Sequence, residues 1–169
     1  AVVSTDAYYA PLAASYGVPF HHFPLLGSTD EQKAAQEAQV LNIVATEQID
    51  CVILARYMQI LSDNMCQQLN GRAINIHHSF LPSFKGAKPY HQAFNKGVKL
   101  IGATAHFVTA DLDEGPIIEQ DIARVNHAMS AAELTAMGRD VECVTLARAV
   151  KWHAERRVVL NNKKTVVFR

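Results

Sequence analysis

Residues 74–83 read Ile74-Asn75-Ile76-His77-His78-Ser79-Phe80-Leu81-Pro82-Ser83, the pattern of a short strand that runs directly into a loop. Side chains alternate between the two faces of a strand, so Ile74 and Ile76 share one face. Asn75 and His77 share the other, roughly 7 Å apart after two rises of about 3.3 Å. A carboxamide beside an imidazole can stabilise a carbonyl oxygen as it becomes negative. The stretch therefore predicts a buried strand with an active site at its end.

Short apolar runs alternate with segments of helical periodicity on both sides of this strand. We expect further strands at residues 1–4, 18–23, 51–55, 100–108 and 116–125. We expect helices at 7–16, 29–48, 62–71, 90–96 and 130–157, the last beginning with the capping box Ser130-x-x-Glu133. A terminal hairpin is expected from 158–161 and 164–168. The alternation predicts an α/β fold with a mostly parallel sheet covered on both faces, and ligands bind beyond the carboxyl ends of such strands.

Length and charge exclude several classes of protein. At 169 residues the chain is long enough for one domain with its own core. Sixteen basic residues balance sixteen acidic ones, so we expect no nucleic-acid partner. No apolar run approaches the ~20 residues that span a bilayer, and we expect no membrane partner. The cysteines show no C-x-x-C spacing, which favours reduced thiols and a cytoplasmic location; they are Cys51, Cys66 and Cys143.

A second polar segment, Thr109-Ala110-Asp111-Leu112-Asp113-Glu114-Gly115-Pro116, lies between two expected strands. One interpretation is a solvated turn, because Asp and Gly are favoured in turns for backbone reasons. The other is that one carboxylate folds back over the end of the sheet and meets His77. There it would orient the imidazole and could take a proton from water or an amine. Spacing alone does not choose among Asp111, Asp113 and Glu114.

Several histidines are candidates for the same site. His77 and His78 are adjacent, so we expect His78 to point away from Asn75 and to be a hydrogen-bonded structural residue. A metal site built from His77, His91, His106 and an Asp is an alternative, because imidazole and carboxylate are zinc ligands. No H-E-x-x-H motif or paired His/Cys spacing supports it.

Other catalytic patterns are missing from the sequence. It contains no G-x-S-x-G elbow, no P-loop and no G-x-G-x-x-G after a strand. Cys51 and Cys143 fall in a core strand and a helix, where we expect them to pack. The segment 56–61, Arg-Tyr-Met-Gln-Ile-Leu, is unusually apolar for a loop at the carboxyl edge of a sheet. It is either core or one wall of a slot for a flat heteroaromatic ring.

Taken together, these motifs resemble the formyltransferase family of folate-dependent enzymes, which use an Asn–His–Asp triad on 10-formyltetrahydrofolate. The resemblance covers essentially the whole chain and is strongest to the branch that hydrolyses this substrate. The phrases that carry it are Asn75-Ile76-His77, His78-Ser79-Phe80-Leu81-Pro82, Gly86-Ala87-Lys88-Pro89-Tyr90-His91-Gln92-Ala93, Gly102-Ala103-Thr104-Ala105-His106-Phe107, Leu112-Asp113-Glu114-Gly115-Pro116-Ile117-Ile118 and Gly138-Arg139-Asp140-Val141-Glu142.

The resemblance implies a fold and a set of site residues. The fold is a Rossmann-like open sheet of the formyltransferase type with a C-terminal hairpin. Asn75 would bind the formyl oxygen, His77 would stabilise the oxyanion, and Asp113 would pair with His77 and accept a proton from water. His106 would support this triad. The residues implied to line the pterin pocket are Met58, Ile60, Leu61, Ala110 and Asp111.

The implied reaction is hydrolysis of 10-formyltetrahydrofolate to formate and tetrahydrofolate, in one-carbon balance and purine supply. It needs a small-molecule folate substrate and neither metal nor redox cofactor. Residues 1–169 would form one catalytic domain. Family members carry a further strand and helix and an ACT-type regulatory domain before it, and we expect these to be missing here. The terminal hairpin and long helix make a homo-oligomer an expectation. The alternatives are a glycinamide ribonucleotide formyltransferase and a non-catalytic folate-binding module.

Overall fold

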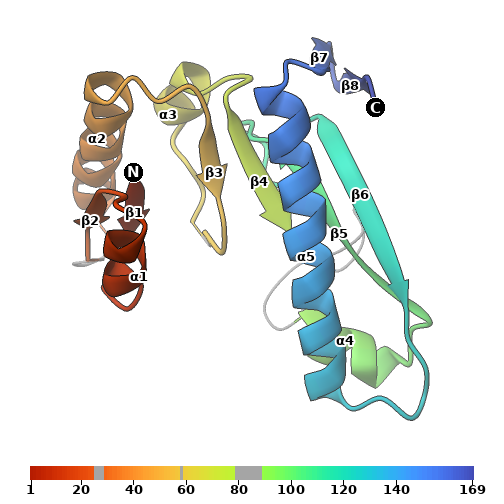
Figure 1. Ribbon diagram of the computed structural model, residues 1–169. Coiled ribbons are helices and arrows are strands. Elements are labelled where there is room, and N and C mark those ends of the chain that lie inside the picture. Colours follow the sequence, from red (N-terminus) through yellow and green to blue (C-terminus); the bar gives the residue numbers. More distant parts are fainter. Residues whose placement is uncertain (25–28, 58, 79–88) are drawn as a thin grey trace. The chain divides into compact units, whose positions relative to one another are not determined.

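The computed structural model describes residues 1–24, 29–57, 59–78 and 89–169 (Figure 1). The chain divides into two compact units, Ala1–Asp50 and Cys51–Arg169. Met58 and the loop from Ser79 to Lys88 lie outside the described residues.

The first unit is built of two short strands and two helices. They are β1 (Val2–Ser4), α1 (Ala10–Ser15), β2 (Phe20–His22) and α2 (Asp30–Thr46). β1 and β2 pair in parallel because α1 provides the crossover between them. α1 begins at Ala10 rather than at the expected residue 7, since the Asp6 carboxylate accepts a hydrogen bond from Tyr8 N at 2.7 Å and holds a turn there. Thr29 caps α2 by accepting from Gln32 N at 3.3 Å.

The second unit holds a four-stranded sheet in the order β3-β4-β5-β6, with β7 and β8 as a separate hairpin. Its elements are β3 (Val52–Leu54), α3 (Asp63–Gln68), β4 (Ala73–His77), α4 (Pro89–Lys96), β5 (Leu100–Phe107), β6 (Ile117–Arg124), α5 (Ala131–Ala154), β7 (Val158–Asn161) and β8 (Lys164–Val167).

The α/β class and the terminal hairpin are confirmed, while the sheet is mixed rather than mostly parallel. β3 and β4 are parallel, but β5 runs antiparallel to both β4 and β6. The short turn between β5 and β6 accounts for that pair, since parallel neighbours need a crossover of a dozen or more residues and antiparallel ones need only a turn. β4 and β5 are antiparallel although a longer segment that contains α4 joins them.

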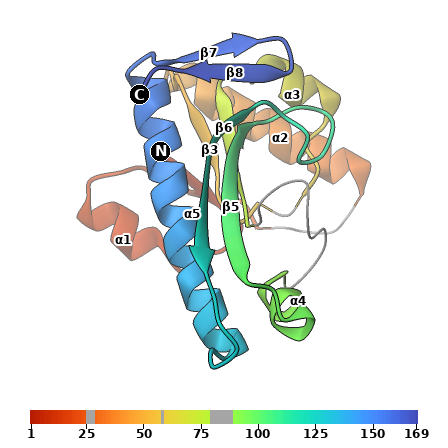
Figure 2. The same ribbon diagram turned by 90° about the vertical axis from the view of Figure 1, so that its right-hand side faces the viewer.

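Helix α5 packs along one face of β4, β5 and β6 (Figure 2). It starts at the expected capping box, where Ser130 N donates to Glu133 Oε2 at 2.7 Å and Glu133 N donates to Ser130 Oγ at 3.3 Å. The core under it is formed by Ile74, Ala105, Phe107, Ile118 and Ala149, with Ile76 packed against it. Because Ile74 and Ile76 take this face, Asn75 and His77 lie on the other side of β4. None of the described helices is both long and apolar enough to cross a membrane.

Candidate active site

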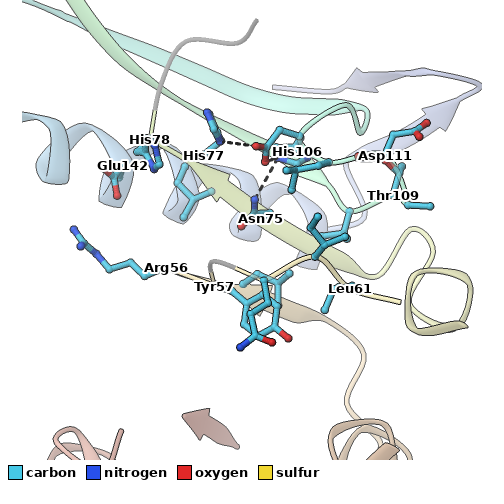
Figure 3. A pocket seen from close by; sticks show the side chains of 18 of the residues that line it. Arg56, Tyr57, Leu61, Asn75, His77, His78, His106, Thr109, Asp111 and Glu142 are labelled. Carbon is cyan, nitrogen blue, oxygen red and sulfur yellow. Dashed lines mark hydrogen bonds and ion pairs between the residues drawn. The ribbon is translucent and has the colours of Figure 1, made fainter. Parts of the chain in front are cut away.

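Two neighbouring strands bring three polar side chains together. Asn75 and His77 lie at the carboxyl end of β4. The antiparallel register with β5 sets His106 directly opposite Asn75. Asp113 comes from the turn between β5 and β6, and Figure 3 shows the side chains around this point. The structure therefore joins residues from three segments, and it supports the interpretation in which a carboxylate of the turn folds back to His77.

The turn between β5 and β6 is folded tightly against the end of β5. Phe107 N donates to Pro116 O at 2.9 Å. A Cβ on Gly115 would lie 1.7 Å from Phe107 O, so no larger residue fits there without displacing the backbone. Asp113 itself has a left-handed backbone, with φ at 57°. This course of the chain brings the Asp113 carboxylate to His77, whereas Asp111 and Glu114 are exposed. Asp113 is thus the turn carboxylate that contacts His77.

Asp113 contacts two imidazoles. Its Oδ2 lies 3.2 Å from His77 Nδ1 and its Oδ1 lies 3.7 Å from His106 Nε2. The Nε2 of His77 is buried and has no hydrogen-bond partner among the residues that the structure describes. Because Asp113 occupies Nδ1, Nε2 is the ring nitrogen that can meet a substrate.

The protonation of His106 follows from its contacts. Its Nδ1 lies 2.8 Å from the Phe107 carbonyl oxygen, which can only accept, so Nδ1 carries the hydrogen. In the neutral ring Nε2 then accepts, and it lies 3.4 Å from Asn75 Nδ2. His106 therefore orients the Asn75 amide with Nδ2 toward the His106 ring. The second N–H group of this amide stays available for a substrate.

Burial is the largest influence on the pKa values of these histidines. It lowers the pKa of His106, against the opposing effects of the Phe107 carbonyl and the Asp113 carboxylate. Burial also lowers the pKa of His77, helped by the neighbouring His78 and His106 and opposed by Asp113. The neutral imidazole is thus favoured until a negative charge develops nearby.

A pocket of about 740 Å³ opens beside these residues. Of the residues expected from the sequence, those that the structure describes all line it, namely Ile60, Leu61, Asn75, His77, His106, Ala110, Asp111 and Asp113. Met58 lies outside the described residues. Ile60 and Leu112 are 56% and 57% exposed, so apolar surface faces the opening where a flat ring could lie. The roles of these residues stay predictions.

His78 lies differently from the expectation. Its ring stacks on that of His77, with centroids 4.7 Å apart and an angle of 24° between the planes. The expectation that His78 points away is wrong because β4 ends at His77, and the alternation of a strand does not extend past its end. His78 also lines the pocket, and its Nε2 is buried without a hydrogen-bond partner in the described part of the chain.

A further pair in the pocket wall was not found from the sequence. Tyr90 of α4 donates its hydroxyl to Glu142 Oε1 of α5 at 2.5 Å, and both residues line the pocket. Burial and the Glu142 carboxylate raise the pKa of Tyr90 well above its usual range. The family-like phrases contain both residues, but no spacing rule connects two separate helices.

The alternative of a metal site finds no support. In the ranges that the structure describes, no group of three or more His, Cys, Asp or Glu side chains is arranged to hold a metal ion. His91 lies on α4 and lines the pocket, but no hydrogen bond or ion pair found among the described residues joins it to His77 or His106.

Known proteins resemble this chain over nearly its whole length. A formyltetrahydrofolate deformylase of Corynebacterium sp. (strain P-1) is 51% identical over 168 residues, which are 99% of this chain and 58% of the relative. The crystal structure of a formyltetrahydrofolate deformylase from Burkholderia mallei is 63% identical, with a TM-score of 0.91 over 99% of this chain and 58% of that one. The structure of a phosphoribosylglycinamide formyltransferase from Anaplasma phagocytophilum is 30% identical, with a TM-score of 0.88 over 99% of this chain and 80% of that one.

The chain spans little more than half the length of the deformylases that it matches. Residues 2–150 match the model of the family described as formyl transferase. The site residues Asn75, His77, His106 and Asp113 all fall within this match. On the strength of this match and these relatives, the chain belongs to the formyl transferase family.

Proposed function

We propose that the protein hydrolyses 10-formyltetrahydrofolate to formate and tetrahydrofolate. The observation that carries the proposal is the His77–Asp113 pair beside Asn75, at the wall of a pocket large enough for a flat ring. The names of the most similar deformylases support the same reaction. Because the chain covers only part of those proteins, the activity is tested on the full-length polypeptide.

In the proposed binding mode the formyl group lies over the end of β4. Asn75 Nδ2 donates its available hydrogen to the formyl oxygen, while His106 Nε2 accepts the other. The pterin ring packs against Leu61 and Ile60, with the Ala110–Asp111 segment opposite. This arrangement holds the formyl carbon beside His77 and Asp113.

The proposed reaction begins when a water oxygen attacks the formyl carbon. Before the attack His77 takes a proton from solvent at Nε2, and the Asp113 carboxylate stabilises this imidazolium. Nε2 then donates to the formyl oxygen as it becomes an oxyanion and keeps its proton when the intermediate collapses. Asp113 Oδ1 accepts the proton from water. The bond from carbon to N10 then breaks, N10 takes the proton, and formate leaves.

The proposal also covers the cofactors, location and partners of the protein. No metal or redox cofactor takes part in these steps, because Asn75 and His77 polarise the formyl group and Asp113 moves the proton. We propose a cytoplasmic protein without nucleic-acid or membrane partners. A homo-oligomer formed through α5 and the β7–β8 hairpin is also proposed, and light scattering on the full-length protein measures its mass.

The test mixes the full-length protein with 10-formyltetrahydrofolate and follows formate and tetrahydrofolate, with and without glycinamide ribonucleotide. Formate released without an acceptor establishes the hydrolase. Turnover only with the ribonucleotide present makes the protein a formyltransferase, and tight folate binding without turnover makes it a binding module. Asp113→Asn runs alongside and should lose formate release. Glu114→Gln is its matched control, because Glu114 lies on the same turn as Asp113 but is exposed and outside the pocket.

A further inference from the structure

The pocket has a polar end that the proposed folate contacts do not use. In Figure 3, His78, Glu142 and Arg56 lie on the opposite side of Asn75 from Asp111. All of them line the same pocket. The folate contacts proposed above involve other residues of the wall, so these three side chains are candidates to hold the second reactant.

Among the described residues at this end, His78 has a buried polar atom without a hydrogen-bond partner. Its Nε2 is buried, and no other described residue hydrogen-bonds to it. Buried polar atoms are paired in folded proteins, so an unpaired one calls for a functional or solvent partner. The stacked ring of His77 has the same property at its own Nε2. The two unpaired nitrogens therefore belong to adjacent rings at one wall of the pocket.

The surroundings hold the His78 ring in place. It stacks on the ring of His77, and its centroid lies 6.5 Å from that of Tyr90. Tyr90 is fixed in turn by its hydrogen bond to Glu142 and by close packing on Gly138. A Cβ on Gly138 would lie 2.1 Å from the Tyr90 ring. Glycine costs about 1 kcal/mol in a helix interior relative to alanine. At position 138 the close approach of the Tyr90 ring is the physical reason why glycine is present.

The charges that face His78 come from several elements. Glu142 of α5 and Asp113 of the β5–β6 turn raise its pKa, and Arg56 after β3 lowers it. Burial is the largest influence and lowers the pKa of His78 below its usual 6.5. At neutral pH the ring is therefore uncharged, with one nitrogen that donates and one that accepts.

We propose that His78 is a further catalytic residue, whose Nε2 accepts a hydrogen bond from the attacking water and aims the water oxygen at the formyl carbon. This inference rests on the proposed hydrolysis. One water hydrogen faces His78 and the other faces Asp113, which takes it as the new carbon–oxygen bond forms. The carbon–N10 bond then breaks with the same proton passing to N10. His78 thus keeps its own protonation state throughout and serves to hold the nucleophile.

The experiment compares two products made by the full-length protein from 10-formyltetrahydrofolate. One is formate, from water, and the other is formohydroxamate, formed when hydroxylamine is added as a small nucleophile. The variants are His78→Leu and His78→Gln. Matched controls are His127→Leu and His127→Gln, because His127 is exposed between β6 and α5 and lies outside the pocket.

We expect His78→Leu to lower kcat for formate by roughly 10- to 100-fold with KM unchanged, the usual cost of a misplaced reactant. The ratio of formohydroxamate to formate should rise, because hydroxylamine does not depend on a held water. His78→Gln should recover part of the formate rate, since its amide oxygen can also accept. An unchanged kcat, or a parallel loss of both products in both variants, would overturn the role of His78. A wild-type protein that releases no formate would instead reject the proposed hydrolysis, and the inference with it.

Discussion

Asp113 Oδ2 lies 3.2 Å from His77 Nδ1, and the backbone that delivers this carboxylate is left-handed, with φ at 57°. Such a conformation costs most residues about 1–2 kcal/mol, and Asn and Asp are the side chains that tolerate it best after glycine. The contact and the backbone thus both favour a short carboxylate at position 113. Substitutions at this position therefore test charge and conformation separately.

Asp113→Asn removes the charge and keeps a side chain suited to the left-handed turn. We expect formate release from 10-formyltetrahydrofolate to fall about 10²- to 10⁴-fold, the range for loss of a general base, while the melting temperature changes little. Steady-state kinetics and thermal unfolding of the full-length protein measure the two effects. Asp113→Ala should lose activity to the same degree and also unfold at a lower temperature. Full activity of Asp113→Asn would remove Asp113 from the mechanism.

Asn75→Ala removes the amide that lies 3.4 Å from His106 Nε2. Loss of one oxyanion donor costs roughly 10²–10³ in kcat, and we expect that loss here with a smaller change in KM. Asn95→Ala on α4 is the control, because Asn95 is exposed and lies outside the pocket. If both alanine variants keep the wild-type kcat, the amide of Asn75 has no part in the reaction.

Local patterns were enough to predict several elements. The alternation of Ile and polar residues at 74–77 and the capping box at Ser130 predicted β4 and the start of α5, and the structure confirms both. These signals depend on neighbours two to four residues apart. The same is true of the face on which Asn75 and His77 lie together.

Longer-range geometry could not be predicted in the same way. The choice of Asp113 over Asp111 depends on how closely Gly115 approaches Phe107 O, a contact between two chain segments. The direction of His78 depends on where β4 ends, and strand ends are the least certain feature of a sequence pattern. The pairing of Tyr90 with Glu142 joins two helices whose relative placement only the fold decides.

Gly115→Ala should break the site by displacing the turn. Its Cβ would lie 1.7 Å from Phe107 O and 3.1 Å from His106 Nδ1, so the hydrogen bond between these two groups cannot persist unchanged. We expect a loss of about 2–4 kcal/mol in the free energy of unfolding together with most of the activity, measured by urea unfolding and formate release.

Gly97→Ala shows the effect of backbone strain without the steric clash that an added Cβ makes at Gly115. Gly97 has φ at 61° but nothing within 4 Å of an added Cβ. The free energy of unfolding of its alanine variant should therefore fall by only about 1–2 kcal/mol, the conformational cost of the left-handed backbone, and the activity should be kept. If Gly115→Ala and Gly97→Ala lower the free energy of unfolding and the activity equally, the contact of Gly115 with Phe107 is unimportant.

Stability should fall as the solution becomes acidic. Burial lowers the pKa of His77, His78 and His106 in the folded protein below 6.5, the value for an exposed histidine. Below about pH 6.5 the unfolded chain therefore binds more protons than the folded one, and the free energy of unfolding decreases with falling pH. The decrease should begin near pH 6.5 and continue through the lower folded pKa values. Urea unfolding of the full-length protein between about pH 7.5 and 5.5 measures it.

His106→Gln isolates one contribution to the dependence of the unfolding free energy on pH. The glutamine can donate to the Phe107 carbonyl as His106 does, but it does not titrate. Because the variant has one lowered pKa fewer, its free energy of unfolding should depend less steeply on pH than that of the wild type. His127→Gln, at an exposed position, should leave the slope as it is. A wild-type slope of zero, or one that His106→Gln does not reduce, would mean that burial of the site histidines carries no cost in acid.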